Sequence, residues 1–578
     1  MPDPDRRLWQ RFWAIASPYW REGERLRAWG LLTLLILLLL GQTRFAVLLN
    51  EQTGEFTSAL AARDEARFWT AIHYCLVLLG LAIPIYAFYY FVRDTLAIYW
   101  RRWLTFRFLG NYFSHRHFYE LNANAGIDNP DQRVAEDINT FTQRSLYFLL
   151  IGIGSLLQLL AFSHVLWSIS HELVYFLVIY ALIGTLVTLL FFGGRLMRLN
   201  FHQLRREADF RYSLVRVREN AEPIAFYRGE GQELQQVRQR FLAAFRNFRH
   251  LIRVQLGLNF FQHAYGLLTI VLPSAIIASR VLSGELEVGR AVQAAGAFAA
   301  VLSAISLIVE NFEGLSRFAA GIERLDTLAR FLPGHPASSL HHESRILTLD
   351  AQTLAFDRVT LQTPDRERVL VHDLSFSVAP GEHLLIVGES GSGKSSLLRA
   401  IAGLWHAGSG TVYRPGPDDI LFLPQQPYML LGSLRHQLLY PRRDHYAPES
   451  RLLQVLAAVN LADLASRFGG LDAEMDWPRL LSVGEQQRLA LARVLLAKPR
   501  FAVLDEATSA LDPANEARLY QQLLASGTTL VSVAHRPGML RYHTRVLALD
   551  GMGGWRYQTA AQFRFSDAPG TSLTGDEP

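Results

Sequence analysis

Cysteine and lysine are rare in this chain of 578 residues, and each scarcity limits the structures or functions that the chain can have. The single cysteine, Cys75, has no partner for an internal disulfide, so disulfide bonds do not hold the fold together. Lysine occurs only at Lys394 and Lys498, which leaves 55 arginines among the 57 basic residues. We attribute this bias, and the net charge of +5, to genome composition rather than to nucleic-acid binding. Because the chain otherwise uses arginine, the lysine at position 394 nevertheless indicates a chemical role for that residue.

The overall composition fits neither a purely membrane-embedded chain nor an ordinary soluble enzyme. Half of the residues are hydrophobic, yet 19% are charged and the mean hydropathy is only +0.12. A membrane part joined to a soluble part explains these averages. The same composition excludes a disordered chain, collagen-like repeats and a small disulfide scaffold.

Long apolar runs fill the first part of the chain. Residues 1–28 mix arginine with tryptophan and other aromatic residues, which is typical of an interfacial amphipathic helix. A run from 29 to about 49 can cover roughly 31 Å as a helix, enough to cross the bilayer core. Five further spans are predicted near 70–92, 145–168, 173–193, 255–281 and 291–311. We therefore expect six spans within residues 29–332, with long helical extensions over 93–144 and 194–254.

Arginine placement predicts how these spans are oriented. Arginines gather after the second and fourth spans, whereas the segment 51–68 carries a net charge of −2. Positive charge favours the cytoplasmic side, so we expect both termini and the long even-numbered loops to be cytoplasmic.

The pattern of apolar residues changes near residue 346, from long runs to short ones. Short apolar runs such as 384–388 and 501–505 are typical of buried strands, and 395–404 is typical of a helix after a glycine-rich turn. Residues 346–563 are therefore predicted to form an α/β domain, preceded by a linker at 333–345 and followed by a disordered tail at 564–578.

A glycine-rich loop follows the first of these strands. The run Gly388-Glu-Ser-Gly-Ser-Gly-Lys-Ser fits G-x-x-x-x-G-K-[ST], the loop that wraps its backbone N–H groups around phosphates. Lys394 is expected to pair with the β- and γ-phosphates of ATP and Ser395 to hold Mg²⁺. The predicted ATP-binding residues are Gly388, Glu389, Ser390, Gly391, Ser392, Gly393, Lys394, Ser395 and Ser396.

A second motif supplies two carboxylates. Asp505 and Glu506 follow the apolar run 501–504, which places them at the carboxyl end of a buried parallel strand. Asp505 is predicted to support Mg²⁺, and Glu506 to polarise the water that attacks the γ-phosphate.

Between the two motifs stands Leu481-Ser-Val-Gly-Glu-Gln-Gln-Arg488, which resembles the LSGGQ signature of the ATP-binding-cassette (ABC) superfamily. Gln425 and His535 match the family's Q-loop glutamine and switch histidine, and Ser509–Asp512 matches its D-loop. The resemblance implies that Gln425 also contacts Mg²⁺ and that Gln425, Glu506 and His535 act in catalysis. It further implies that the signature residues contact the ATP of a second subunit: Ser482, Val483, Gly484 and Glu485.

Two departures from the family pattern stand out. Val483 replaces a glycine and Glu485 replaces a glutamine in the signature, so we expect slower closure at most. Thr363 lies where many exporter-type cassettes carry an aromatic residue that stacks on adenine.

Further phrases narrow the resemblance to subfamily D. They are NPDQRVAEDI (129–138), NAEPIAFYRGE (220–230) and LPQQPYMLLGSLRHQLLYP (423–441). This subfamily holds peroxisomal fatty-acyl-CoA half-transporters and bacterial relatives, whose membrane domain resembles the BacA/SbmA peptide importers. The resemblance implies that Glu222 belongs to a helical turn that couples the cassette to the spans.

These observations predict an all-α six-span transmembrane domain followed by an α/β P-loop ABC ATPase domain. We expect a homodimer in the bacterial inner membrane, in contact with lipid and without nucleic acid, which uses ATP and Mg²⁺ to import a peptide or another bulky hydrophilic solute. Two alternatives stay open: transport of fatty acyl-CoA or another amphiphile, and a proton-coupled carrier with a regulatory cassette. Candidate cavity residues within or near the spans are Arg44, His263 and Glu310.

Overall fold

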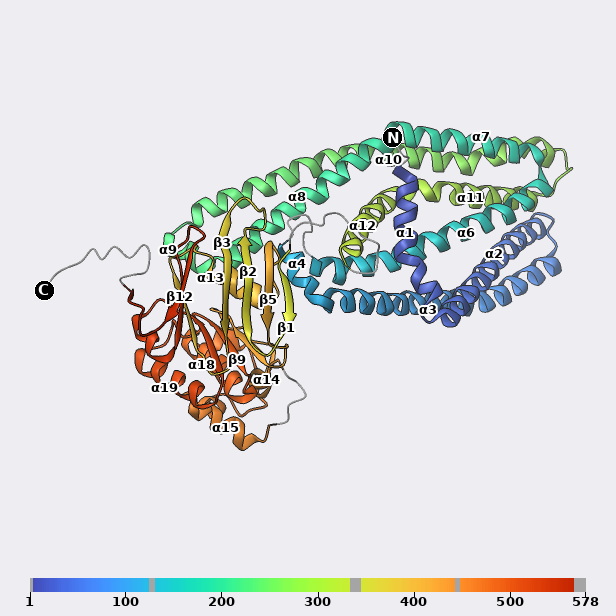
Figure 1. Ribbon diagram of the computed structural model, residues 1–578. Coiled ribbons are helices and arrows are strands. Elements are labelled where there is room, and N and C mark those ends of the chain that lie inside the picture. Colours follow the sequence, from blue (N-terminus) through green and yellow to red (C-terminus); the bar gives the residue numbers. More distant parts are fainter. Residues whose placement is uncertain (1–3, 124–129, 333–344, 442–446, 566–578) are drawn as a thin grey trace. The chain divides into compact units, whose positions relative to one another are not determined.

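The computed structural model describes residues 4–123, 130–332, 345–441 and 447–565. The chain divides into two compact units between residues 338 and 339. The first unit is entirely helical in its described part, and the second unit combines β-sheets with helices (Figure 1). The predicted fold class, a six-span helical domain followed by an α/β domain, is confirmed.

Helices of very unequal length build the first unit. Six stretches in its described part are long and apolar enough to cross a membrane: Arg25–Ala61, Glu65–Phe113, Pro130–Ile169, His171–Glu219, Glu230–Leu282 and Val288–Leu307. The α-helices are α1 (Pro4–Arg21), α2 (Arg25–Ala61), α3 (Glu65–Phe113), α4 (His117–Ala123), α5 (Pro130–Gln132), α6 (Ile138–Ile169), α7 (His171–Val187), α8 (Gly194–Glu219), α9 (Ala221–Tyr227), α10 (Glu230–Leu282), α11 (Val288–Glu310) and α12 (Phe312–Phe331). Two π-helical segments, Arg133–Asp137 and Thr188–Gly193, continue into α6 and join α7 to α8.

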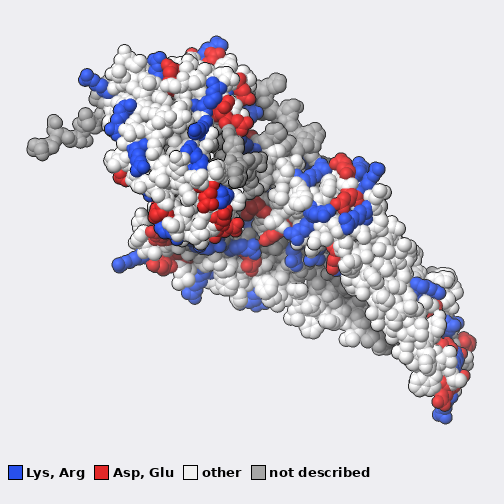
Figure 2. All heavy atoms as spheres, turned by 90° about the horizontal axis from the view of Figure 1, so that it is seen from below, with Lys and Arg blue, Asp and Glu red and all other residues white. Residues whose placement is uncertain are grey.

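The surface of this unit suits a lipid environment. Large apolar side chains on α3 point outward, and those of Leu76, Ile83 and Phe91 are more than half exposed. Figure 2 shows a broad surface with few charged atoms on this unit. A soluble unit rarely leaves so wide an apolar surface exposed, whereas the same surface is stable against hydrocarbon.

Several boundaries differ from the sequence prediction. Helix α1 ends at Arg21 and α2 already begins at Arg25, four residues before the predicted start of the first span. The predicted helix over 93–144 is interrupted, because α3 ends at Phe113, where Ser114 is extended and Arg116 has a φ of 63°. The predicted linker and tail lie almost wholly outside the described residues, at 333–344 and 566–578.

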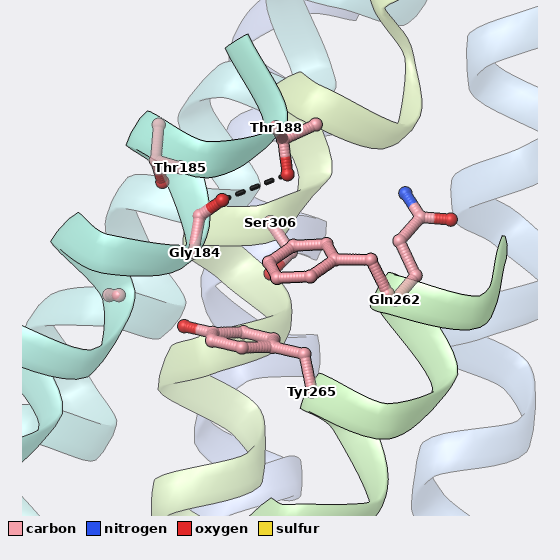
Figure 3. Close-up of a pocket in the computed structure, with 8 residues that line it drawn as sticks. Gly184, Thr185, Thr188, Gln262, Tyr265 and Ser306 are labelled. Atoms are coloured by element: carbon pink, nitrogen blue, oxygen red, sulfur yellow. Dashed lines mark hydrogen bonds between the residues drawn. The ribbon is translucent and has the colours of Figure 1, made fainter. Parts of the chain in front are cut away.

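Helices α7 and α10 are joined through a stacked pair of tyrosines. The rings of Tyr180 and Tyr265 lie 4.2 Å apart and nearly parallel. Each hydroxyl donates to the other residue's backbone carbonyl, at 2.6 Å from Tyr180 and 2.7 Å from Tyr265. Tyr265 reaches α7 at Gly184, as Figure 3 shows, where a Cβ atom would lie only 2.4 Å from the ring. Only glycine allows this approach.

Helices α2 and α11 cross at a second site of small residues. A Cβ atom on Gly289 would lie 1.8 Å from the carbonyl oxygen of Gly54, so the two backbones are in direct contact. The Gly289 amide donates to the Ser58 hydroxyl at 3.1 Å. Small residues and hydroxyl bonds of this kind hold membrane helices together where no hydrophobic effect drives them to associate.

Two larger sheets and one small sheet form the second unit. The six-stranded sheet has the order β12-β11-β4-β10-β9-β6, the four-stranded sheet the order β1-β5-β2-β3, and β7 pairs with β8. The strands are β1 (Leu347–Asp350), β2 (Leu354–Gln362), β3 (Val369–Val378), β4 (Leu384–Gly388), β5 (Gly408–Arg414), β6 (Ile420–Leu423), β7 (Gly432–Ser433), β8 (Glu474–Met475), β9 (Phe501–Asp505), β10 (Thr529–Val533), β11 (Arg545–Leu549) and β12 (Trp555–Thr559). The helices are α13 (Lys394–Ile401), α14 (Leu434–Leu439), α15 (Glu449–Ala458), α16 (Leu464–Arg467), α17 (Trp477–Leu480), α18 (Val483–Ala497) and α19 (Pro513–Ala525).

The topology of the larger sheet positions the site. Strands β4, β10, β9 and β6 are neighbours and run parallel. Their residues are largely buried aliphatic side chains, which suits strands that are covered on both faces. Parallel neighbours end at the same edge, so the residues that follow these four strands gather there.

Candidate active site

The glycine-rich loop leads from β4 into α13. Gly391 and Gly393 have φ values of 82° and 98°, which side-chain-bearing residues rarely adopt. A Cβ atom on Gly388 would lie 2.6 Å from the carbonyl oxygen of Leu549, so this position also needs glycine. The buried Ser392 hydroxyl has no hydrogen-bond partner among the described residues. A loop with this backbone and a free hydroxyl fits phosphate oxygens.

The Lys394 ammonium lies inside this loop. It donates to the carbonyl oxygens of Gly388 and Glu389 at 2.8 and 2.7 Å. Burial lowers the pKa of Lys394, while the carboxylates of Glu506 and Asp505 oppose that shift. A partly desolvated ammonium held by two neutral carbonyls is ready to exchange them for an anionic ligand.

Three predicted catalytic residues meet at the edge of the sheet. Gln425 follows β6, Glu506 follows β9 and His535 follows β10. The Gln425 amide donates from Nε2 to Glu506 Oε2 at 2.9 Å, and His535 Nε2 lies 3.2 Å from Glu506 Oε1. Glu506 has a φ of 48°, an unusual backbone conformation for this residue type. Both oxygens of one carboxylate are thus oriented by side chains from the two neighbouring strands.

Asp505, the last residue of β9, is a partly buried carboxylate next to Glu506. Burial and the neighbouring Glu506 carboxylate raise the pKa of Asp505, and the cations Arg399 and Lys394 only partly oppose this. One carboxylate, an amide oxygen and a hydroxyl form a donor set that suits Mg²⁺. The residues that can hold the ion are Ser395, Gln425 and Asp505.

The signature residues lie at the start of α18. Ser482 is its N-cap, and its hydroxyl donates to Glu485 Oε2 at 2.9 Å. The Ser482 amide donates to the same oxygen at 2.8 Å. Val483 is more than half exposed, so the larger side chain at this position causes no clash within the chain.

One buried side chain that the sequence did not single out connects these segments. Gln487 is 1% exposed, and its amide donates to the Ser509 hydroxyl at 3.2 Å and to the Gln425 carbonyl at 3.4 Å. Its Oε1 accepts from the Ala510 amide at 3.0 Å. A glutamine on the largely apolar buried face of α18 could have indicated this role.

The remaining predicted residues lie in the first unit. Glu222 is exposed on the seven-residue helix α9, between α8 and α10. Arg44 and His263 are exposed on α2 and α10, and neither lines the cavity described next. The side chain of Glu310 lies outside the part of the chain that the structure describes.

A small cavity of about 60 Å³ opens between α7, α10 and α11. Figure 3 shows Thr185 and Thr188 on the α7 side, Gln262 and Tyr265 on α10, and Ser306 behind them. The Thr188 hydroxyl donates to the Gly184 carbonyl at 2.8 Å. None of the residues that line the cavity is ionisable except Tyr265, so its polar groups are hydroxyls and an amide.

Two family models match the chain. Residues 23–282 match the ABC transporter transmembrane region 2, and residues 371–509 match the ABC transporter model. An ABC transporter ATP-binding protein of Synechocystis is 47% identical over 92% of this chain and 82% of its own length. The chain belongs to the ABC transporters. It is a half-transporter, with one membrane region and one ATPase domain whose activity is coupled to transport.

Two eukaryotic relatives place the transporter near subfamily D. The chloroplastic ABC transporter D family member 2 of Arabidopsis thaliana is 38% identical over 94% of this chain and 86% of its own length. The human lysosomal cobalamin transporter ABCD4 is 31% identical, over 96% of both chains. The transporter thus shares its whole architecture with this subfamily, as the sequence phrases predicted.

Proposed function

We propose that this transporter is a homodimer of the bacterial inner membrane that imports a peptide or another bulky hydrophilic solute at the expense of ATP. The observation that carries the proposal is the convergence of Gln425 and His535 on Glu506, at the sheet edge that also presents Lys394. A regulatory cassette needs no such arrangement. This observation favours powered transport over the proton-coupled alternative.

The chemistry follows from what each group can do. Glu506 accepts a hydrogen bond from the attacking water and orients it toward the γ-phosphate, while Gln425 and His535 keep its two oxygens in place. Lys394 and the loop amides bind the phosphate charge, and His535 is positioned to contact the γ-phosphate. Ser395, Gln425 and Asp505 would hold Mg²⁺, which would supply additional charge neutralisation when bound.

A second copy of the chain completes the site in this proposal. The helix N-terminus at Ser482 and Gly484 is an anion-binding end that contributes to the ATP of the opposite subunit. ATP binding then favours the closed dimer and hydrolysis releases it. The α9 turn around Glu222, exposed at the junction of two long helices, transmits this movement to the spans.

The cavity between α7, α10 and α11 is too small to enclose a cargo, but its lining could contact one neutral polar group of a cargo. Among the described residues, the side chains of Thr185, Gln262 and Ser306 have no hydrogen-bond partner. Unpaired polar groups within a membrane-spanning region are unfavourable unless a polar ligand or water satisfies them. Backbone amides of a peptide have the required chemistry, whereas a phosphate or carboxylate would lack a cation here.

Cobalamin is a second candidate cargo. The human relative named as a cobalamin transporter matches this chain over 96% of both lengths. Cobalamin is also a bulky hydrophilic solute, and one of its uncharged carboxamides could contact the same neutral cavity.

The test uses purified protein in liposomes, with ATP hydrolysis and uptake measured together. Wild type is compared with Glu506→Gln, and Glu449→Gln, an exposed carboxylate at the start of α15, serves as the control. Labelled hexapeptide, cyanocobalamin and palmitoyl-CoA are offered separately. Only Glu506→Gln should lose both hydrolysis and uptake of the hexapeptide or cyanocobalamin. Uptake that persists in Glu506→Gln and follows a pH gradient refutes the proposal, as does uptake of palmitoyl-CoA alone.

A further inference from the structure

The signature helix α18 carries its own anion at its N-terminus. Glu485, which stands where the signature usually has a neutral glutamine, folds back onto the helix end. Its Oε2 accepts from the Ser482 amide at 2.8 Å and from the Ser482 hydroxyl at 2.9 Å. The carboxylate therefore binds the hydroxyl of Ser482, a residue that the proposed function assigns to the ATP of the opposite subunit.

Two anions at one helix end repel each other. The positive end of a helix favours one negative group, and Glu485 already provides it. A triphosphate that approaches the exposed Ser482 would meet the carboxylate of Glu485, whose side chain is only 14% exposed. Repulsion between two charges is stronger where water screens them less. Either Glu485 must be neutralised or the partner's ATP must bind weakly.

Arg467 supplies the missing positive charge. Its Nη1 lies 2.9 Å from Glu485 Oε1, the oxygen that Ser482 leaves free. The Glu485 side chain is only 14% exposed, so this ion pair is partly shielded from solvent. Burial raises the pKa of Glu485, but the bonds from Ser482 and Arg467 outweigh it, so the pKa lies below its usual range.

Local contacts hold Arg467 at this position. Its guanidinium stacks over the Phe468 ring at 4.9 Å, and its Nη1 lies 3.5 Å from the Asp463 carboxylate. Phe468 packs against the buried Trp477, with ring centroids 5.5 Å apart. The cation is thus anchored to the core of the cassette.

We propose that Arg467 is a positioning residue for ATP hydrolysis, which holds the Glu485 carboxylate and cancels its charge so that Ser482 can bind the γ-phosphate of the opposite subunit. When the phosphate arrives, the Ser482 hydroxyl turns from Glu485 to a phosphate oxygen. Arg467 then remains as the partner of the carboxylate. No proton moves between these groups. The inference rests on the proposed ATP hydrolysis by a dimer.

The test is a double-mutant cycle on the reconstituted full-length protein. Arg467→Gln should raise the KM for ATP about tenfold, with a smaller change in kcat, because an unpaired Glu485 repels the second subunit's ATP. Glu485→Gln removes that charge, so Arg467→Gln in the Glu485→Gln background should change KM less than twofold. Arg467→Lys retains the charge and should stay within about threefold of wild type.

A matched control separates this effect from a general loss of charge. Arg479 lies in α17, just before the signature, is 86% exposed and pairs only with the nearby Asp476 at 3.3 Å among the described residues. Arg479→Gln should leave the KM for ATP unchanged. Thermal unfolding midpoints of all variants show whether any of them is misfolded.

The outcomes distinguish this inference from the function on which it rests. If the wild type hydrolyses no ATP, or Lys394→Ala hydrolyses as much as the wild type, the proposed function fails. If the wild type is active and Arg467→Gln matches it, the role of Arg467 is refuted. Equal impairment of Arg467→Gln with and without Glu485→Gln also refutes it, because Arg467 would then act only through the fold.

Discussion

The approach of Tyr265 to Gly184 allows a quantitative test of how the spans pack. In Gly184→Ala, the new methyl group would lie 2.4 Å from the Tyr265 ring, about 1 Å short of the 3.4 Å of ordinary contact. The ring cannot move aside freely, because its hydroxyl donates to the Tyr180 carbonyl and Tyr180 donates back. The two helices must therefore separate, or both bonds must weaken.

The expected cost follows from these contacts. Overpacking a tightly packed site costs about 1–3 kcal/mol. Each lost hydrogen bond between membrane helices adds roughly 0.6 kcal/mol. Gly184→Ala should therefore destabilise the protein by about 2–4 kcal/mol.

Thermal unfolding in detergent, followed by near-ultraviolet circular dichroism, measures this loss. Gly266→Ala is the matched control. Gly266 lies on the same helix as Tyr265, and a Cβ atom there would meet nothing within 4 Å. In a Tyr265→Ala background the ring is gone, so Gly184→Ala should cost almost nothing. The reasoning is refuted if Gly184→Ala is as stable as Gly266→Ala, or if its cost is the same with and without the ring.

Three further predictions concern other contacts. Gly289→Ala should destabilise the α2–α11 crossing by about 1–3 kcal/mol, whereas Gly80→Ala, with open space around it, should not; equal unfolding midpoints would contradict the direct backbone contact. Asp505→Asn should raise the unfolding midpoint without nucleotide but abolish Mg²⁺-dependent hydrolysis, because burial penalises the native charge; a lower midpoint would contradict this. Burial lowers the pKa of His543 from 6.5 to about 4, so the unfolded chain takes up the proton first as the pH falls. Stability should drop by about 2 kcal/mol between pH 7 and pH 5, and His543→Gln should reduce that drop; an unchanged pH profile in the variant would argue against it.

Sequence patterns sufficed for features that depend on neighbouring residues. Six spans were predictable because a membrane helix must be apolar over about 20 consecutive residues, which composition alone reveals. The loop at Gly388–Ser395 was predictable because phosphate binding needs glycines and a lysine at fixed spacing along one turn. The family resemblance predicted that Gln425, Glu506 and His535 act together in catalysis, although they are far apart in the chain. Their catalytic roles stay predictions.

Helix ends were predicted less well than helices. The sequence from 93 to 144 has few helix breakers, yet α3 ends at Phe113. The chain turns there through Ser114 and Arg116, and a single serine is only a weak turn signal. Packing and chain reversal override weak local preferences at such points.

Only the tertiary structure decided which distant side chains meet. Arg467 and Glu485 are separated by β8 and α17, and no spacing rule connects them; the fold of the cassette brings them to 2.9 Å. Gly184 and Tyr265 belong to different spans, and the need for glycine arises from a ring 81 residues away. Local chemistry depends on consecutive residues and can be predicted from them. Charge neutralisation and close packing depend on distances that exist only once the chain has folded.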